Sequence, residues 1–453
     1  MKNVNMLKYN TLMIVVLMIF IGCAEKKSNN LADTFDKDAK EELIDKWYPL
    51  ALDKDDGGYY TNITYDFKVG NEHEKMIVTQ SRQVWVTSKA YKEYGDKEYL
   101  TYAEHGFKFL RDVMWDKENG GFHTLVTKEG EPIMKPYEAK TAYGNAFAIY
   151  ALAAYYDVSK DAEALELAKK VFMWLEEHSH DKEYKGYFQH MEMDGTPIVR
   201  TEDIASTSDA GYKDQNSSIH LMEAFTELYQ VWKDDIVKER LTELLLLIRD
   251  TIVNDKYSMD LFFTPDWTPV SFREESKEVI QEHFYLDHVS FGHDVETAYL
   301  MLEASEVLGR TDTEKTLEIG KKMVDHSLTY GLDNKLGGFY EGGYYFKGDD
   351  VLTITNYDKN WWAQAEGLNT LLIMTRMYPD DKMNYYEKFE DLWKYTQQYM
   401  MDDKYGGWYS WGTDVRPEVK KELKGHVWKT TYHNFRALIN CKHQLEFLKK
   451  KKS

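Results

Sequence analysis

Gly57-Gly58-Tyr59-Tyr60 is the first copy of a short phrase in which an acidic or polar turn precedes two glycines and two aromatic-type residues. The phrase returns along the chain, and a degenerate copy is expected at Asp260-Leu261-Phe262-Phe263. The clear later copies are Gly120-Gly121-Phe122-His123, Lys185-Gly186-Tyr187-Phe188, Gly337-Gly338-Phe339-Tyr340 and Gly406-Gly407-Trp408-Tyr409. The copies lie roughly 60 to 80 residues apart, and recurrence at such a period is typical of a repeat architecture.

Two helices are predicted between successive copies. Residues Gly144 to Asp157 are apolar on nearly every side, as a buried helix requires. Residues Asp161 to Glu177 place apolar side chains along one stripe and charged ones elsewhere, which predicts an amphipathic outer helix. Further inner helices are expected near Arg82, Ser217, His293, Trp361 and Tyr432, and further outer helices near Lys97, Asp235, Asp312 and Lys382, with Asp38 to Leu52 as the remaining outer helix.

The repeat predicts an all-α fold, an (α/α)6 barrel of six inner and six outer helices that spans residues 38–447. The chain has only eight prolines, which favours long helices. Closure of the ring is an inference, and an open solenoid is the alternative. Because glycine accepts positive φ angles, the Gly-Gly phrases are predicted to form tight turns in short β-hairpins at one end of the barrel, just before the inner helices.

The composition limits the classes of partner. A formal net charge of −20 over 453 residues would repel nucleic acid phosphates, so no nucleic acid partner is expected. Aromatic residues make up 15% of the chain, including 12 Trp and 34 Tyr. Such rings suit the apolar face of a sugar, although large helical cores also use them.

Each predicted inner helix has, at or near its start, a polar residue that a purely apolar core would not select. A closed barrel brings these residues to one mouth, although each one alone could be a helix cap or a satisfied core group. The helix N-termini at that mouth would also favour anionic intermediates. The residues are Arg82, Asn145, His220, His293, Glu366 and His433.

Three histidines at one mouth could instead bind zinc. His220, His293 and His433 are 73 and 140 residues apart, whereas zinc signatures usually pair ligands a few residues apart. No local motif supports a metal site, so none is predicted.

Four phrases resemble signatures of the N-acylglucosamine 2-epimerase superfamily. Ser290 to Glu296 (SFGHDVE) is similar to its SFGHDIE phrase, and Trp361 to Glu366 (WWAQAE) to its WW-QAE phrase. Gln80 to Trp85 resembles its early arginine motif, and Trp428 to Arg436 (WKTTYHNFR) its WK-PYHN-R segment. The resemblance runs from about residue 40 to residue 447, and the YHN-R ending looks more like the cellobiose or mannobiose 2-epimerase branch than the N-acylglucosamine branch.

The resemblance implies roles for individual residues. His293 and His433 match the two acid/base histidines of the family, and Arg82 matches the arginine that contacts the sugar oxygens near C1 and C2. Glu366 matches a carboxylate that holds the substrate or orients a histidine. His220 lies in Asn216 to His220 (NSSIH), which resembles the family's N-T-H-L-H. Two departures are Ser218 in place of a histidine and Asn145 in place of glutamine, and the second is expected to alter substrate choice.

These residue types suit inversion at C2 of an open-chain aldose. The C2 proton is acidic because the C1 carbonyl accepts charge, so one base removes it to give an enediolate and a proton returns on the opposite face. Two histidines match this requirement, because their pKa lies near neutral pH. Arg82 can stabilise the oxygen that becomes anionic. Neither a redox cofactor nor a metal is required, and none is predicted.

The remaining site residues are predicted to hold the sugar. Tyr143, Trp362 and Trp428 are candidates for stacking, with an ordinary core position as the alternative. Asn145 and Glu296 complete the predicted substrate-binding set, and His220 is expected to assist ring opening.

Two other functions stay open on the sequence. A glycoside hydrolase, or a related unsaturated-uronide hydrolase, needs two carboxylates about the scissile bond, which Glu366 with Asp294 or Glu296 could supply. Acidic residues at a helix start also serve as partners of the helix dipole. A non-catalytic sugar-binding lipoprotein is the third class, although a bare binder has no need of opposed bases.

The N-terminus predicts export and lipid anchoring. Lys2 and Lys8 precede an apolar run from Thr11 to Ile21, which is too short to span a bilayer. The run ends in Phe20-Ile21-Gly22-Cys23, which resembles a bacterial lipoprotein cleavage box with Phe where Leu is usual. Residues 1–22 are therefore predicted to be a signal peptide, Cys23 the lipidated residue of an exported, membrane-anchored protein, and residues 23–37 a tether. A short uncleaved anchor is the alternative.

Overall fold

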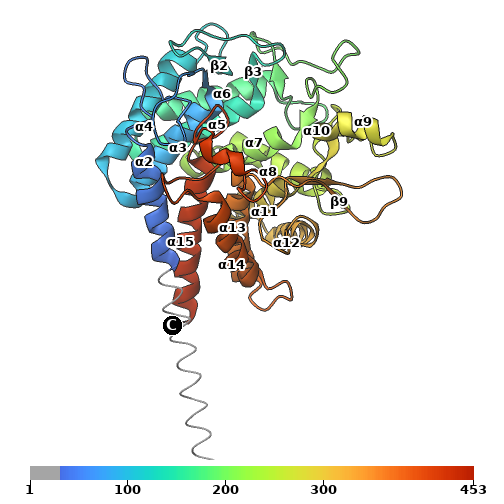
Figure 1. Cartoon of the computed structure of the whole chain (residues 1–453). Helices are drawn as coiled ribbons and strands as arrows, with labels where there is room; N and C mark the ends of the chain where they lie inside the picture. Colours follow the sequence, from blue (N-terminus) through green and yellow to red (C-terminus); the bar gives the residue numbers. More distant parts are fainter. Residues whose placement is uncertain (1–30, 453) are drawn as a thin grey trace, which may run out of the picture.

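The computed structural model describes residues 31–452. Six long helices form its inner layer and the other helices surround them (Figure 1). The inner helices are α3 (Ile77–Tyr94), α5 (Ala142–Ser159), α7 (Gln215–Val231), α11 (Phe291–Leu308), α13 (Trp361–Met377) and α15 (Tyr432–Lys452). The outer helices are η1 with α2 (Asp38–Ile44 and Asp45–Trp47), α4 (Lys97–Phe109), α6 (Ala162–His178), α8 (Asp235–Leu247), α12 (Thr313–Tyr330) and α14 (Tyr385–Tyr395).

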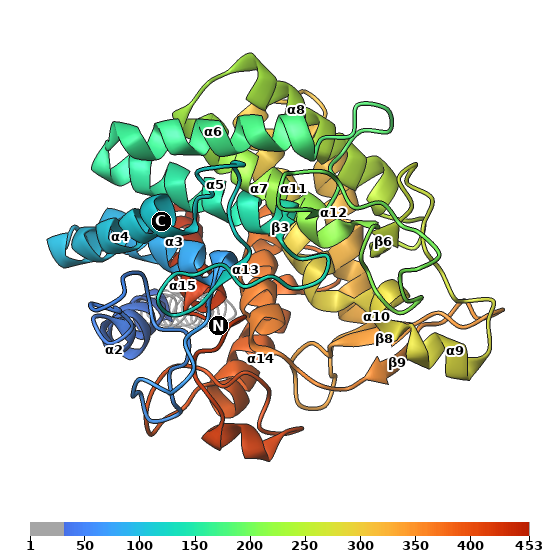
Figure 2. The same cartoon turned by 90° about the horizontal axis from the view of Figure 1, so that it is seen from above.

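The inner helices close into a ring. Each one packs against the next in the order α3, α5, α7, α11, α13, α15, and α15 packs back against α3. Figure 2 shows the six helices around a common centre. Each of α4, α6, α8, α12 and α14 packs against the inner helix that precedes it, and η1 packs against α15. The predicted (α/α)6 barrel is therefore confirmed, and the contact between α15 and α3 excludes the alternative of an open solenoid.

Helix character follows from the sequence of each segment. In α5 every residue from Ala142 to Tyr155 is buried, as expected of a helix enclosed on all sides. In the outer helix α6 only one face is buried, and Asp161 caps its start by accepting from the backbone N–H of Glu163. The N-cap of α5 is Thr141, whose hydroxyl accepts from Gly144 N.

The Gly-Gly phrases form tight antiparallel turns, as predicted. Leu52 bridges to Tyr59 across the first turn, and Gly57 and Gly58 adopt φ angles of +82° and +65°, which favour glycine. A Cβ atom on Gly58 would lie only 2.8 Å from the ring of Phe109. The same bridge recurs at Trp115–Phe122, His180–Tyr187, Leu332–Phe339 and Met401–Trp408.

The degenerate fourth copy lies three residues earlier than predicted. Val253 bridges to Met259, so the turn is Tyr257-Ser258-Met259, and Tyr257 has a φ of +63°. The aromatic pair Phe262–Phe263, which suggested the later position, instead forms strand β6 and pairs with β5 (Lys213–Asp214). The prediction gave weight to aromatic residues, whereas the turn depends on the positive φ.

Short strands link each repeat to the next. β1 (Lys75–Met76) precedes α3 and pairs with β2 (Leu125–Val126), which follows the next hairpin. β3 (Lys140–Thr141) pairs in the same way with β4 (His190–Met191). β7 (Val289–Ser290) pairs with β8 (Gly342–Tyr344), which also pairs with β9 (Thr353–Asn356). Smaller helices α9 (Lys277–Glu282) and α10 (Phe284–Asp287) precede β7.

A buried lysine pairs with an aspartate in five of the six repeats, and we call this pair the lysine clamp; four of the aspartates are buried and Asp333 is partly exposed. In four repeats the lysine Nζ also donates to a backbone carbonyl of the hairpin turn, as Lys140 does to Gly120 O at 2.5 Å. The lysine side chains are at most 1% exposed. The pairs are Lys75–Asp53 (2.8 Å), Lys140–Asp116 (2.7 Å), Lys213–Asp181 (2.7 Å), Lys359–Asp333 (2.8 Å) and Lys424–Asp402 (2.7 Å).

The fourth repeat replaces both charges of the clamp together. Val289 opens strand β7, the position that lysine holds in β1, β3 and β5, and Asn254 stands where the other repeats have aspartate. The Asn254 amide donates to Asp260 Oδ1 at 3.0 Å. Because a buried charge without a partner is costly, losing the cation and the anion together avoids the penalty of losing one.

The folded region begins before the predicted tether ends. Residues 31–37 are helical, and the fully buried ring of Phe35 lies 4.3 Å from the ring of Trp393. Because the apolar ring of Phe35 packs into the barrel, the folded region starts earlier than the polar composition of this segment predicts. The predicted signal peptide and Cys23 lie outside the described residues. Among residues 31–452, no helix combines the length and apolar character needed to cross a membrane.

Replacing Lys140 with Val is expected to lower the free energy of unfolding by about 3–5 kcal/mol, because the Asp116 carboxylate stays buried without its cation. The double variant Lys140→Val with Asp116→Asn imitates the fourth repeat and should recover most of the loss. Urea-induced unfolding of the chain without its first 23 residues measures both. A double variant as unstable as the single one would show that the pair is not the cause.

Candidate active site

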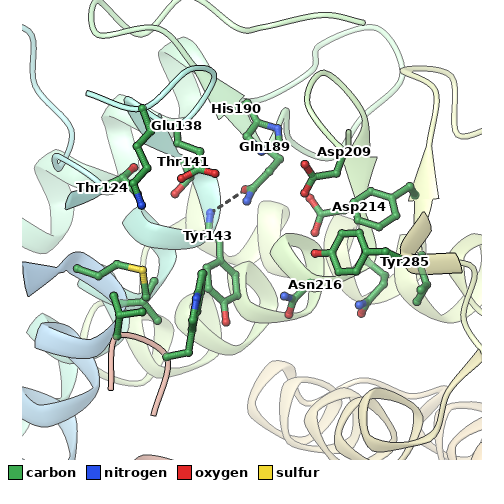
Figure 3. Close-up of a pocket in the computed structure, with 18 of the residues that line it drawn as sticks. Thr124, Glu138, Thr141, Tyr143, Gln189, His190, Asp209, Asp214, Asn216 and Tyr285 are labelled. Atoms are coloured by element: carbon green, nitrogen blue, oxygen red, sulfur yellow. Dashed lines mark hydrogen bonds between the residues drawn. The ribbon is translucent and has the colours of Figure 1, made fainter. Parts of the chain in front are cut away.

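Two adjoining cavities open at the hairpin end of the barrel. The inner cavity has a volume of about 270 Å³, and the outer one, shown in Figure 3, about 290 Å³. Both are lined by Tyr143, Asn216, Tyr285, His293 and Trp428. The inner cavity is also lined by Arg82, His220, Glu296, Trp361, Trp362 and His433.

Most of the predicted site residues meet in the inner cavity. They come from the N-terminal turns of the inner helices, with Arg82 on α3, Tyr143 on α5 and His220 on α7. His293 and Glu296 come from α11, Trp362 from α13 and His433 from α15, while Trp428 lies just before α15 and is 53% exposed. Glu366 of α13 is fully buried beneath the cavity, where it contacts His433.

Asn145 lies outside both cavities. Its amide oxygen accepts from Phe122 N at 3.0 Å and its amide nitrogen donates to Thr141 O at 2.8 Å. Gln80 and Gln364 make the matching bond to the backbone N–H of Tyr59 and of Phe339. The side chain predicted to bind substrate therefore fastens the second hairpin to α5.

Each of the three histidines is held through Nδ1. His220 Nδ1 lies 2.7 Å from Glu223 Oε2 and His433 Nδ1 lies 2.6 Å from Glu366 Oε1, so in both pairs the imidazole donates. His293 Nδ1 lies 2.9 Å from the Ser290 hydroxyl, a weaker partner. Nε2 is left as the nitrogen that can exchange a proton with a substrate.

Burial keeps the histidines neutral. It lowers the pKa of His293 to about 3, helped by the other histidines nearby. The pKa of His433 also lies well below its usual value, because burial and the guanidinium groups of Arg82 and Arg436 oppose protonation. Burial lowers the pKa of His220 despite the bond to Glu223. A neutral imidazole can accept a proton at neutral pH.

Arg436 on α15 joins three buried carboxylates beneath the cavity. Its Nη1 bonds Glu223, and its Nη2 bonds Glu296 Oε1 at 2.5 Å and Glu366 Oε1 at 2.8 Å. Burial and the neighbouring Glu366 raise the pKa of Glu296 to about 8. At Glu223 burial also acts to raise the pKa, but the charge of Arg436 and the hydrogen bond from His220 outweigh it and lower the pKa to about 2.

Neither Arg436 nor Glu223 was among the residues predicted for the site. Each follows a predicted histidine by three residues, Glu223 after His220 on α7 and Arg436 after His433 on α15. Residues at this spacing share a helix face. A search for charged residues one turn beyond each candidate histidine would have found both.

Arg82 is a buried cation without an anionic partner. Its Nη2 donates to the Tyr143 hydroxyl at 3.1 Å, and its guanidinium lies 4.4 Å from the centre of the Phe147 ring. No carboxylate of the described residues lies within ion-pair distance of it, although its side chain is 96% buried. Because a buried cation is stabilised by an anion, this position is suited to an oxygen that gains negative charge.

The arrangement does not favour a metal or a pair of hydrolytic carboxylates. Potential ligand atoms of Glu296, Glu366 and His433 lie within 4.8 Å of one another, but Arg436 already donates to both carboxylates. Asp294 accepts from Met259 N at 3.0 Å and lines neither cavity. Glu296 and Glu366 meet at one guanidinium instead of flanking a bond between them.

Comparison with known proteins gives a consistent result. Residues 58–437 match the family described as N-acylglucosamine 2-epimerase (GlcNAc 2-epimerase). The chain is 28% identical over 412 residues to a cellobiose 2-epimerase of Bacteroides fragilis, covering 90% of this chain and 98% of that protein. It is 30% identical over 418 residues to a cellobiose 2-epimerase of Ruminococcus albus, covering 88% and 96%. The solved structure of cellobiose 2-epimerase from Bacillus thermoamylovorans B4167 superimposes with a TM-score of 0.78 at 25% identity, covering 92% and 99%.

Replacing Arg436 with Met should lower the free energy of unfolding at pH 7 by about 3–5 kcal/mol, because the carboxylates of Glu223 and Glu366 stay buried without their cation. Above pH 4.5 the ionised Glu223 supplies stability in the wild type that is lost as the pH falls through its folded pKa of about 2. The deficit of the variant should therefore shrink below pH 4. Urea unfolding across pH tests this, with Arg376→Met as the control, and a deficit independent of pH would contradict it.

Proposed function

The chain belongs to the N-acylglucosamine 2-epimerase family, and on this basis we propose that it is a carbohydrate epimerase that inverts C2 at the reducing end of a cellobiose-type disaccharide. One observation carries the assignment. The centre of the Trp362 ring lies close to two neutral histidines, 4.7 Å from the centre of the His293 ring and 5.9 Å from that of His433. A sugar stacked on Trp362 would therefore be near both imidazoles.

The reaction proceeds through the open-chain aldose. Nε2 of one histidine takes the C2 proton, the electrons of the C–H bond form the C1=C2 double bond, and the carbonyl electrons move to the C1 oxygen. The other histidine, which must first gain a proton from water at Nε2, then delivers that proton to the opposite face of C2, so that one imidazole ends protonated and the other neutral. Glu366 stabilises the imidazolium form of His433 through Nδ1.

Arg82 supports the intermediate electrostatically. Its guanidinium has no carboxylate to neutralise it, so the negative charge that develops on the sugar oxygen completes a pair that the free enzyme lacks. The stabilisation is larger in the intermediate than with the neutral sugar, which is the condition for faster turnover.

The outer cavity supports a substrate of two sugar units. Trp428 and Tyr285 line both cavities and are 53% and 61% exposed, so they offer flat surfaces where two linked rings would meet. Figure 3 shows Glu138, Asp209 and Asp214 around the outer cavity, with Gln189 beside Tyr143. Carboxylates and amides are suited to sugar hydroxyls. The similarity to cellobiose 2-epimerases supports the same choice.

A panel of reducing sugars in D2O tests the function. Mannose, N-acetylglucosamine, cellobiose and mannobiose would be incubated with the chain lacking residues 1–23 and followed by proton NMR. Cellobiose or mannobiose should gain deuterium at C2 together with its C2 epimer. His433→Ala should reduce the exchange by about 10²–10⁴-fold, because it removes a proton-transferring group, whereas His443→Ala on the same helix should not. Undiminished exchange in His433→Ala would refute its role, and new anomeric signals from oligosaccharides without exchange would indicate a hydrolase.

We also propose that the protein is an exported lipoprotein anchored through Cys23. The support is the sequence alone: a positive start, an apolar run of signal-peptide length, and Gly22-Cys23 at its end. One acyl chain binds membranes only reversibly, and the several chains of a lipidated cysteine bind more firmly.

Cys23→Ser should abolish incorporation of radiolabelled palmitate in the bacterium and shift the protein out of the membrane fraction. Cys441→Ser is the matched control, because that cysteine is buried in the barrel. Equal labelling of Cys23→Ser and wild type would contradict the anchor.

A further inference from the structure

The three carboxylates around Arg436 are unequally supplied with hydrogen-bond donors. Glu223 accepts from His220 Nδ1, the Tyr432 hydroxyl and Arg436. Glu366 accepts from His433 Nδ1, the Tyr299 hydroxyl and Arg436. Glu296 accepts from Arg436 alone, through Oε1, and among the described residues its Oε2 has no hydrogen-bond partner. Glu296 is also the member of the three that lines the inner cavity.

Charge balance places a proton on Glu296. With neutral histidines, three ionised carboxylates around one guanidinium would leave two uncompensated negative charges in a fully buried cluster. Glu296 and Glu366 share the same Nη2 of Arg436, and two carboxylates so close do not both ionise readily. The proton belongs on the carboxylate with the fewest donors, and its free oxygen is Oε2 of Glu296.

Resting on the proposed function, we propose that Glu296 is the general acid that opens the sugar ring, with His220 as the base, and that the protein therefore also interconverts the α and β anomers of its substrate. The two histidines at C2 and Arg82 act only on the open chain. A reducing sugar in solution is almost entirely cyclic, so a separate acid and base must first open it in the cavity.

The bond changes balance within the site. His220 Nε2 takes the proton of the C1 hydroxyl, whose electrons form the C1 carbonyl. The bond from C1 to the ring oxygen breaks, and that oxygen takes the proton from Glu296 Oε2. The products are the open-chain aldose, a Glu296 carboxylate beside Arg436 and a His220 imidazolium beside Glu223. Closure on the other face of C1 reverses each step and gives the other anomer.

The hydrogen-bond network lowers the electrostatic free energy needed to move these protons. His220 and Glu296 are joined through Glu223 and Arg436, so a proton lost by Glu296 and one gained by His220 leave the net charge of the buried cluster unchanged. Each new charge already has an opposite partner in place, so no further buried charge must be desolvated. His293 and His433 remain neutral and available for the C2 proton.

Mutarotation measures ring opening apart from epimerisation. Crystalline β-cellobiose would be dissolved with enzyme and its anomeric protons followed by NMR. Wild type should accelerate equilibration of the anomers, and Glu296→Gln should slow the enzymatic rate by on the order of 10²-fold or more. Glu306→Gln, an exposed carboxylate on the same helix, should match wild type.

Two checks separate a lost proton donor from a lost fold. Glu296→Gln should still bind cellobiitol, an open-chain polyol that needs no ring opening, with its affinity in calorimetry changed less than tenfold. Glu296→Asp keeps an acid and should retain more mutarotase activity than the Gln variant. If the Gln variant is unfolded, the Asp variant decides, because activity there no higher than the uncatalysed rate overturns the proposal.

The outcomes distinguish the two proposals. Mutarotation at the wild-type rate in Glu296→Gln overturns the role of Glu296 and leaves the epimerase intact. Mutarotation by wild type without C2 exchange on any sugar refutes the epimerase but supports the acid. Neither activity in wild type refutes both.

The pH dependence gives a second readout. The acid is present below the Glu296 pKa of about 8 and is lost as the pH rises through it, so mutarotation should decline above pH 8. The groups that face Glu296 are Glu223 and His220 of α7, Tyr299 of α11, Glu366 of α13, and His433 and Arg436 of α15. Glu296→Asp should move this limb to lower pH, and a limb unmoved by the substitution would contradict the assignment.

Discussion

The buried pair of a lysine and an aspartate is the constraint on which the rest of the barrel depends. In three repeats one ammonium group holds the aspartate, the carbonyl of the hairpin turn and a carbonyl from the next repeat, as Lys140 does with Asp116, Gly120 and Met193. It therefore fixes the start of an inner helix relative to two hairpins at once. Because the cavity is built from those helix starts, the lysine clamps position Arg82 of α3, Tyr143 of α5 and His220 of α7 relative to one another, whereas α11, which carries His293, begins without a clamp.

A second charged cluster lies deeper and serves a different purpose. Arg436 connects α15 to α7, α11 and α13 through three glutamates, where an apolar axis would be the simpler way to pack six helices. Each clamp lysine has one or two aspartates as partners, two in the case of Lys359, whereas in the central cluster three carboxylates share one guanidinium. A proton on one carboxylate lowers this excess of negative charge from two to one. Such a cluster destabilises the fold, but it holds a mobile proton at the place where protons are exchanged with a sugar.

The fold could be predicted from the sequence because repeated turns and helix periodicity are local features, and most residues that line the inner cavity were predicted from their places at helix starts and from the family resemblance, but Asn216, Tyr285 and Trp361 were not. Positions that depend on backbone geometry or on contacts across helices could not. The fourth hairpin was misplaced because Tyr257 supplies the positive φ there without glycine. Asn145 resembled a binding residue because its bond to Phe122 N is invisible in sequence. Glu223 and Arg436 each stand one turn beyond a predicted histidine, but their contact spans 213 residues, so the sequence could indicate the two residues and not their pairing.

The same geometry explains why one cavity can host several proton transfers. A base that becomes charged in an apolar pocket would be stabilised only by the substrate, and its protonation would be unfavourable. Here two of the three imidazoles already have a carboxylate partner, Glu223 for His220 and Glu366 for His433. His293 has only the Ser290 hydroxyl. The histidines are therefore unequal: the protonated form is least stabilised at His293, which is the weakest base of the three. Glu296 stands three residues after His293, as Glu223 does after His220, but it bonds Arg436 and leaves the His293 ring to the Ser290 hydroxyl.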